Sequence, residues 1–330
     1  MNINDIAKMA GVSRTTVSRV FHGGYVSEDA KNRIEQVIRE TGYVPNVRAQ
    51  ALRMKRNLLL GVLVPGFDAD HVRRVLLKIL DDTEKKGYQT IVMRYKGSTD
   101  HLISQIRMLK SRGVDGMVLM LTTYNREIEQ EIDRDYIPSV TIGPGLLKNV
   151  AGVMHDDAEG FALMTNFVLD KGYTKLGILF PPGQETMTVI RRNTVISILK
   201  EHGIEIPDKW NITSDKIGLE HSEYSEIFAK KILMLDELPD AFIAGSDRFA
   251  FRLIDALKSM GVRVPQDIAV TGFGNTEIGL YLRPALTTVD CNPDLLTEKA
   301  LEFLFFQIDQ HEKTTEHIKI APFLVQRESI

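Results

Sequence analysis

The sequence predicts a small all-α head followed by an α/β body whose parallel sheets form two lobes. In residues 1–45, short helical patterns flank a break that contains glycine. From residue 59 onward, apolar strand-like runs alternate with amphipathic helical patterns, which is typical of parallel sheets covered by helices. At 330 residues, the chain is long enough for both parts.

Two helical patterns lie in residues 3–21, on either side of the break Gly11-Val12-Ser13. Their apolar positions predict a shared core, and the polar residues of the second pattern are left facing outward. That core is expected to contain Ile6, Ala7, Ala10, Val12, Val17 and Val20. We expect Ser13 to cap the second helix. Two helices joined by a tight turn with glycine are the arrangement of helix-turn-helix DNA readers.

The second helix supplies the candidates for reading DNA. In such modules its first residues enter the major groove, so Arg14 and Thr15 are expected to contact bases. Arg19, one turn later, can donate two hydrogen bonds to a guanine edge. Contacts to phosphate fix the register without reading the sequence. The candidates for them are Ser13, Thr16, Ser18, His22 and Asn46. For any one of these residues, a solvated helix face is the alternative.

A third helix is predicted after Ser27, which should cap it, and it should end at Thr41-Gly42. The sequence then predicts that the segment 46–58 is a hinge or linker. Because residues 46–56 are too few for a helix that is stable alone in water, we expect them to fold on DNA or on a partner copy. Leu52 could wedge between base steps in the minor groove. A charged linker with one buried leucine is the alternative.

The charge is divided unevenly between the two parts. Residues 1–58 contain ten Lys and Arg against five Asp and Glu, a formal charge of +5, although the whole chain carries −3. The remaining residues therefore carry −8. A basic head on an acidic body is what phosphate binding at one end of the protein requires.

The head and hinge resemble the lac repressor family, in order and without gaps. The matching motifs are Asp5-Ile-Ala-Lys-Met-Ala-Gly-Val-Ser, Thr16-Val-Ser-Arg-Val, Val26-Ser, Gly42-Tyr-Val-Pro-Asn and Ala49-Gln-Ala-Leu. The resemblance implies base contacts by Arg14, Thr15 and Arg19, and a hinge helix that inserts Leu52 into the minor groove, with Ala49 beside it as a further base contact. Val47 and Arg48 depart from the commoner hinge pattern, and we assign them no base contacts.

Eight apolar runs predict the strands of the body, and six amphipathic segments predict helices between them. The strands are expected at 58–64, 90–94, 116–121, 139–142, 175–180, 241–244, 268–271 and 287–289. The helices are expected at 72–86, 101–112, 160–171, 191–202, 223–235 and 249–260. Two sheets fit this number of strands better than one. The first lobe should comprise about 59–158 plus 292–318, and the second about 159–291 plus 319–330.

The body also resembles this family, in Val114-Asp-Gly, Gly172-Tyr-Thr-Lys-Leu-Gly, Gly261-Val-Arg-Val-Pro-Gln-Asp-Ile-Ala-Val and Pro284-Ala-Leu-Thr-Thr-Val. The resemblance implies a body like a periplasmic sugar-binding protein, which closes on a small molecule. Ligands of open α/β sheets bind beyond the carboxyl ends of the strands. The effector candidates are therefore Phe67, Asp68, Tyr95, Thr122, Arg191, Asp247, Phe273 and Asn275. Arg191 matches the effector-binding arginine of the family, and a surface arginine is its alternative. For Asp247, a helix cap is the alternative.

The segment Gly272-Phe-Gly-Asn departs from the family, which commonly has aspartate where Gly274 stands. Loss of that carboxylate would lessen the repulsion of an effector phosphate, and it would also make room for a larger neutral sugar. The Gly-Phe-Gly pattern, together with Ile268-Ala-Val-Thr and Gly23-Gly-Tyr-Val-Ser, is similar to the branch that regulates sucrose and trehalose operons.

These features predict a dimeric DNA-binding regulator of a carbohydrate operon, most simply a repressor, that binds a palindromic operator and a sugar or sugar-phosphate effector. A sugar-binding transport-type protein, or a corepressor-dependent regulator of a non-sugar pathway, is the alternative. We expect no enzyme activity, cofactor or metal, because no nucleophile, base or metal set converges in the sequence. Since no signal peptide or membrane span is visible and Cys291 is the single cysteine, we expect a cytoplasmic protein.

Overall fold

The computed structural model describes residues 1–21, 24–43, 56–67, 69–96, 98–181, 186–213 and 221–330. The chain divides into two compact units, Met1–Leu58 and Leu59–Ile330, which we call the head and the body. Each unit has a hydrophobic core of its own. Within these ranges, no helix has the length and apolar character needed to cross a membrane.

The described part of the head contains three helices, α1 (Ile3–Met9), α2 (Arg14–Phe21) and α3 (Glu28–Thr41). Gly11 adopts a left-handed φ of +63° between α1 and α2, where a side chain would be strained. The residues buried together are Ile6, Ala7, Ala10, Val17, Ile34 and Val37, with Val12 and Val20 half-buried at their edge. The predicted core is therefore confirmed. Ser27 occupies the N-cap position of α3 as predicted, but its side chain accepts no hydrogen bond there.

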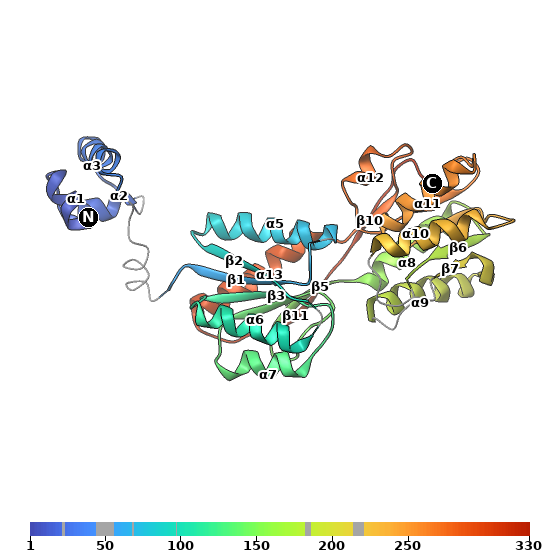
Figure 1. Ribbon diagram of the computed structural model, residues 1–330, viewed down its shortest axis with the longest axis horizontal. Coiled ribbons are helices and arrows are strands. Elements are labelled where there is room, and N and C mark those ends of the chain that lie inside the picture. Colours follow the sequence, from blue (N-terminus) through green and yellow to red (C-terminus); the bar gives the residue numbers. More distant parts are fainter. Residues whose placement is uncertain (22–23, 44–55, 68, 97, 182–185, 214–220) are drawn as a thin grey trace. The chain divides into compact units, whose positions relative to one another are not determined.

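The first lobe of the body is a parallel sheet of six strands in the order β11-β5-β4-β3-β1-β2. These strands are β1 (Leu59–Val64), β2 (Gln89–Arg94), β3 (Gly116–Met120), β4 (Ser139–Ile142), β5 (Ala151–His155) and β11 (His317–Ile320). Figure 1 shows α5 (Asp70–Lys85) and α13 (Pro293–Gln310) on one face of this sheet. The other face carries α6 (Thr99–Ser111) and α7 (Arg126–Arg134).

The second lobe is built on four parallel strands in the order β7-β6-β8-β9. They are β6 (Leu176–Leu179), β7 (Asn211–Ile212), β8 (Ala241–Ala244) and β9 (Ala269–Thr271). Their helices are α8 (Asp157–Asp170), α9 (Thr186–Glu201), α10 (His221–Leu233), α11 (Asp247–Ser259) and the short α12 (Ile278–Tyr281). A separate antiparallel pair joins β10 (Thr288–Asp290) to β12 (Phe323–Val325). The two parallel sheets confirm the predicted α/β body.

The chain crosses between the lobes three times, from β5 to α8, from β10 to α13 and from β11 to β12 (Figure 1). Since β5 lies in the first sheet, His155 at its end and Asp157 at the start of α8 stand at the first crossing. Asp290 ends β10 and stands at the second crossing. His155, Asp157 and Asp290 are thus placed where the chain passes between the two lobes.

Candidate functional site

The helix α2 presents the predicted base-reading residues to solvent. Arg14, Thr15 and Arg19 are exposed, whereas Val17 on the opposite face is fully buried against α1 and α3. Ser13 caps the helix as predicted, because its hydroxyl accepts the Thr16 backbone N–H at 3.1 Å. The surface of α2 is therefore fixed by packing on one face and by a cap at its start.

The remaining head candidates divide into two groups. The Ser13 and Thr16 hydroxyls lie 2.8 Å apart, and Ser18 is half-buried on α2. These three phosphate candidates are therefore next to the predicted base-reading residues. The candidates His22, Asn46, Ala49 and Leu52 lie outside the described residues, so their contacts stay predictions.

In the body, Arg191 of α9 is held at the carboxyl end of the second sheet by a buried carboxylate. Its Nε donates to Asp157 Oδ1 at 2.6 Å, and one terminal nitrogen donates to the Gly245 carbonyl at 3.3 Å. The guanidinium lies over the ring of Phe273 at 4.7 Å from the centroid, and that ring stacks on Phe161 at 4.5 Å. Among the described residues, Nη2 of Arg191 has no acceptor, so it can donate to a ligand.

We call Arg191, Asp157, Phe273 and Phe161 the arginine cluster. Its positive charge, on Arg191, is offset by the negative charge of Asp157. Burial alone would raise the pKa of Asp157, but the charge of Arg191 and the nearby His155 outweigh it and hold that pKa well below 3.8. Asp157 is therefore ionised at neutral pH and compensates the arginine. A ligand at this place would meet a hydrogen-bonding fork whose charge is offset by Asp157.

Two histidines connect this cluster to the first lobe. His155 is 4% exposed, and its Nε2 lies 3.4 Å from Asp157 Oδ1. Within the described residues neither of its ring nitrogens has a well-formed hydrogen bond. The ring of His71 on α5 meets the ring of His155 edge-on at 5.0 Å. The contact with Asp157 is therefore the polar interaction that His155 makes within the described residues.

His71 makes the stability of the body sensitive to pH. Burial, together with the nearby His155 and Arg191, lowers the pKa of His71 from 6.5 to about 3, while Asp157 opposes and Arg74 adds to this shift. In the unfolded chain the imidazole takes up a proton near pH 6.5, but in the folded chain it does not. Stability is therefore fully present above pH 6.5 and is lost as the pH falls from 6.5 toward 3.

We expect His71→Asn to flatten this dependence. Urea unfolding of the body at pH 7.0 and 4.5 should show a loss that is smaller in His71→Asn than in the wild type by about 1–2 kcal/mol. His202→Asn, at an exposed histidine just after α9, is the control and should follow the wild type. An equal loss of stability between pH 7.0 and 4.5 in His71→Asn and the wild type would show that His71 is as readily protonated as an exposed histidine.

The turn after β9 holds Phe273 and Asn275, which lie among different neighbours. Phe273 is stacked in the arginine cluster, but the Asn275 side chain faces the other way, donating to Asp290 at 2.6 Å and accepting from Arg327 at 2.5 Å. Gly274 between them has φ +128°, which strains any side chain, and an added Cβ there would lie 3.8 Å from Asp247 Oδ2. This backbone conformation therefore favours glycine at position 274.

Asp247 is 1% exposed, and both of its oxygens are occupied. It accepts the Thr288 hydroxyl at 2.5 Å, and the Thr276 backbone N–H and hydroxyl at 2.7 and 3.1 Å. Burial raises the pKa of this carboxyl, although these hydrogen bonds oppose the shift. The N-cap of α11 is Ser246, so the helix-cap alternative for Asp247 is wrong. In this structure Asp247 supports the turn 272–276.

The remaining effector candidates belong to the first lobe. Tyr95 donates its hydroxyl to the Met120 carbonyl at 2.9 Å, and Thr122 follows β3 as an exposed residue. Phe67 is 50% exposed after β1, and Asp68 lies outside the described residues. These positions follow β1, β2 and β3, at the carboxyl end of the first sheet.

Sequence reasoning missed Asp157, His155, His71 and Phe161 as members of the site. The run His155-Asp156-Asp157 is the end of β5 followed by a helix cap, since Asp156 accepts the Glu159 backbone N–H at 3.1 Å. Two successive carboxylates after a strand were the available signal, because only one of them is needed for the cap.

Comparison with known proteins agrees with both units. Residues 2–46 match the family described as bacterial regulatory proteins, lacI family. Residues 165–330 match the periplasmic binding protein-like domain. The ribose operon repressor of Escherichia coli K12 is 27% identical over 333 residues, covering 99% of both chains. The repressor PurR of Pasteurella multocida Pm70 is 27% identical over 331 residues, covering 99% of this chain and 98% of the relative.

Solved structures share the fold over the full length. The lac repressor dimer bound to operator and the anti-inducer ONPF has a TM-score of 0.80 at 21% identity, covering 100% of this chain and 98% of the other. The complex of the regulator CelR with cellobiose has a TM-score of 0.69 at 22% identity, covering 100% and 99%. With its matching head and body, the chain belongs to the lacI family of bacterial regulatory proteins and carries a periplasmic binding protein-like body.

Proposed function

We propose that this regulator is a homodimeric, cytoplasmic repressor of a carbohydrate-utilisation operon, and that a sugar bound in the body releases it from a palindromic operator. The observation that carries the DNA-binding part is the surface of α2. Exposed Arg14, Thr15 and Arg19 stand on a helix that is capped at Ser13 and packed through Val17. A helix of this kind inserts its first turns into the major groove.

The phosphate backbone is bound by the charge of the head. The +5 of residues 1–58 attracts phosphate, while the −8 of the remaining residues keeps the body away from it. Two heads from a two-fold symmetric dimer read two half-sites, so the operator should be a palindrome. Both the ribose operon repressor and PurR, which resemble this chain over nearly its full length, are repressors by name.

The arginine cluster supports a sugar as the effector. The Arg191 and Asp157 pair offers donors and an acceptor on a nearly neutral site, and the Phe273 ring provides an apolar face. Sugars present this combination of hydroxyls and apolar ring faces. The effector acts by binding one arrangement of the two lobes more tightly than the other, which shifts the affinity for DNA.

One experiment tests the proposal as a whole. Purified full-length chain is used to select duplexes from a random library, and the selected duplex is titrated with and without ribose, cellobiose, sucrose, trehalose and their phosphates. We expect a palindromic consensus, and a neutral sugar that weakens binding about 10- to 100-fold. A consensus without symmetry would contradict the dimer. Release by a phosphorylated sugar alone would contradict the neutral effector.

A further inference from the structure

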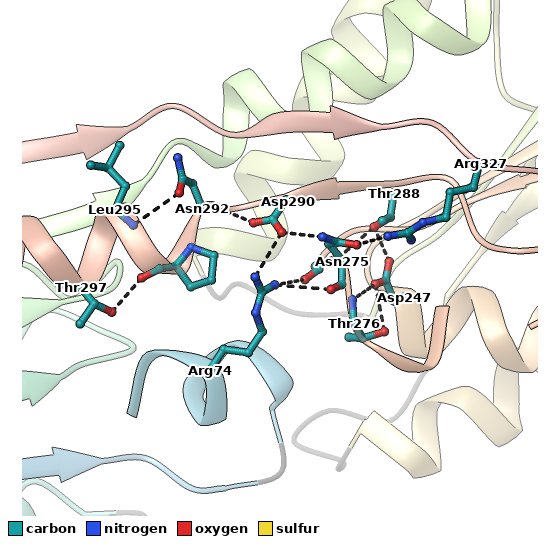
Figure 2. Close-up of polar contacts among 12 residues, drawn as sticks. Arg74, Asp247, Asn275, Thr276, Thr288, Asp290, Asn292, Leu295, Thr297 and Arg327 are labelled. Atoms are coloured by element: carbon teal, nitrogen blue, oxygen red, sulfur yellow. Dashed lines mark hydrogen bonds and ion pairs between the residues drawn. The ribbon is translucent and has the colours of Figure 1, made fainter. Parts of the chain in front are cut away.

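Arg74 of α5 joins the first lobe to the second. One of its terminal nitrogens donates to the carbonyl oxygens of Gly274 and Asn275 at 3.3 and 3.4 Å, and the other donates to Asp290 Oδ2 at 3.2 Å (Figure 2). The Arg74 side chain is 30% exposed, and that of Asp290 is only 5% exposed. A single side chain of the first lobe therefore binds both the turn after β9 and the second crossing between the lobes.

The turn that Arg74 binds is also held by the second lobe. Asn275 donates to Asp290 at 2.6 Å and accepts from Arg327, as Figure 2 shows. Thr276, the next residue, is bound by Asp247. Because the second lobe fixes the turn in place, the bonds of Arg74 constrain how the two lobes lie relative to each other and do not merely order a loop.

The same turn forms part of the arginine cluster. Phe273 precedes the two carbonyls that Arg74 binds, and its ring contacts both Phe161 and the guanidinium of Arg191. On α5, His71 stands three residues before Arg74, so both lie on one face of the helix. Through His71 that face meets His155 at the first crossing. One face of α5 thus contacts the surroundings of the effector site at two separate points.

We propose that Arg74 is a positioning residue that couples the arrangement of the lobes to the effector site. When the lobes separate, Arg74 must leave Asp290. The buried carboxylate then keeps, among the described residues, the uncharged donors of the Asn275 amide and the Asn292 backbone N–H. Separation therefore costs free energy. A ligand that holds Phe273 and Arg191 in place keeps the turn ready for Arg74, so ligand binding and lobe contact favour each other. This inference rests on the proposed effector site.

The lobe arrangement can be measured without knowing the effector. Nitroxide labels on Met108→Cys in α6 and Met234→Cys after α10 report the distance between the lobes, since both positions are exposed, at 45% and 81%. Cys291 is buried, and burial raises the pKa of its thiol, so it stays unlabelled. Full-length labelled chain is mixed with an excess of unlabelled chain, so that each dimer carries one labelled copy, and distances are read by pulsed electron resonance.

We expect one narrow distance in the wild type and an added, different population in Arg74→Gln. Asp290→Asn should show the same added population. In the double variant that population should be no larger than in either single variant, because both changes remove the same contact. Arg73→Ala, at an exposed arginine on the same helix, is the control and should match the wild type. An unchanged distance in Arg74→Gln and Asp290→Asn would overturn the proposal.

A second readout separates positioning from general stability. Ribose and cellobiose serve as probes, and we expect whichever raises the unfolding temperature of the wild type to need about tenfold more sugar in Arg74→Gln. Arg74→Lys keeps one charged donor, so the sugar concentration that it needs should lie between those of the wild type and Arg74→Gln. If neither sugar binds the wild type, the distance measurement still decides the role of Arg74, while the choice of these sugars as effectors fails separately.

Discussion

Deletion of residues 1–58 is expected to abolish specific DNA binding and to leave a folded body. The deletion removes α2 with Arg14, Thr15 and Arg19, and it changes the formal charge of the chain from −3 to −8. Both the base contacts and the attraction to phosphate are thereby lost. The body should remain folded, because it forms a compact unit with its own cores.

The measurement is fluorescence anisotropy with the duplex selected by the full-length chain. We expect a loss of affinity of at least about 1,000-fold, since specific binding exceeds non-specific binding by this factor or more. The truncated chain should unfold cooperatively and should still respond to the sugar that binds the full-length chain. Specific binding by the truncated chain would refute the assignment of DNA reading to the head.

A finer version of this test concerns single residues of the head. Arg19→Ala should cost about 1–3 kcal/mol on the selected duplex and relax the preference at one base pair. Arg39→Ala on α3, an exposed arginine paired with Glu35, is the matched control and should leave that preference unchanged. Equal effects of the two variants would mean that Arg19 contributes charge alone.

Replacement of Arg191 by alanine is the second change with a large expected effect. The Arg191 side chain is 17% exposed and that of Asp157 is 5% exposed, so the variant leaves a buried carboxylate without its cation. Breaking such a pair from one side costs roughly 3 kcal/mol in the free energy of unfolding. The variant also loses the donor fork over Phe273, so the shift in unfolding temperature caused by the sugar should disappear.

A rescue variant separates these two effects. Asp157→Asn in the Arg191→Ala background removes the unpaired charge, so the free energy of unfolding should recover while sugar binding stays lost. Lys200→Ala, at an exposed position on the same helix α9, is the control and should leave both unchanged. If the sugar stabilises Arg191→Ala as strongly as the wild type, the effector site lies elsewhere in the body.

The pattern of apolar residues was sufficient to predict most of the fold. The eight predicted strands correspond to β1, β2, β3, β4, β6, β8, β9 and β10. All of these except β10 belong to the two parallel sheets, whose strands are largely continuous apolar runs. The strands that the apolar pattern did not predict are β5, β7, β11 and β12. Among them, β7 has two residues, and β11 lies at the edge of its sheet with an exposed Lys319. Such strands are specified by their neighbours more than by their own composition.

For the sites, the sequence by itself determined the reading surface of the head. Local rules place Ser13 at the cap, Val17 inside and Arg14, Thr15 and Arg19 outside, since each depends on residues within one or two helical turns. Only the tertiary structure decided the composition of the arginine cluster and the bridge at Arg74. Arg191 meets Asp157 across 34 residues, and Arg74 meets Asp290 across 216. Such pairings are determined by the packing of separate elements, which local spacing does not contain.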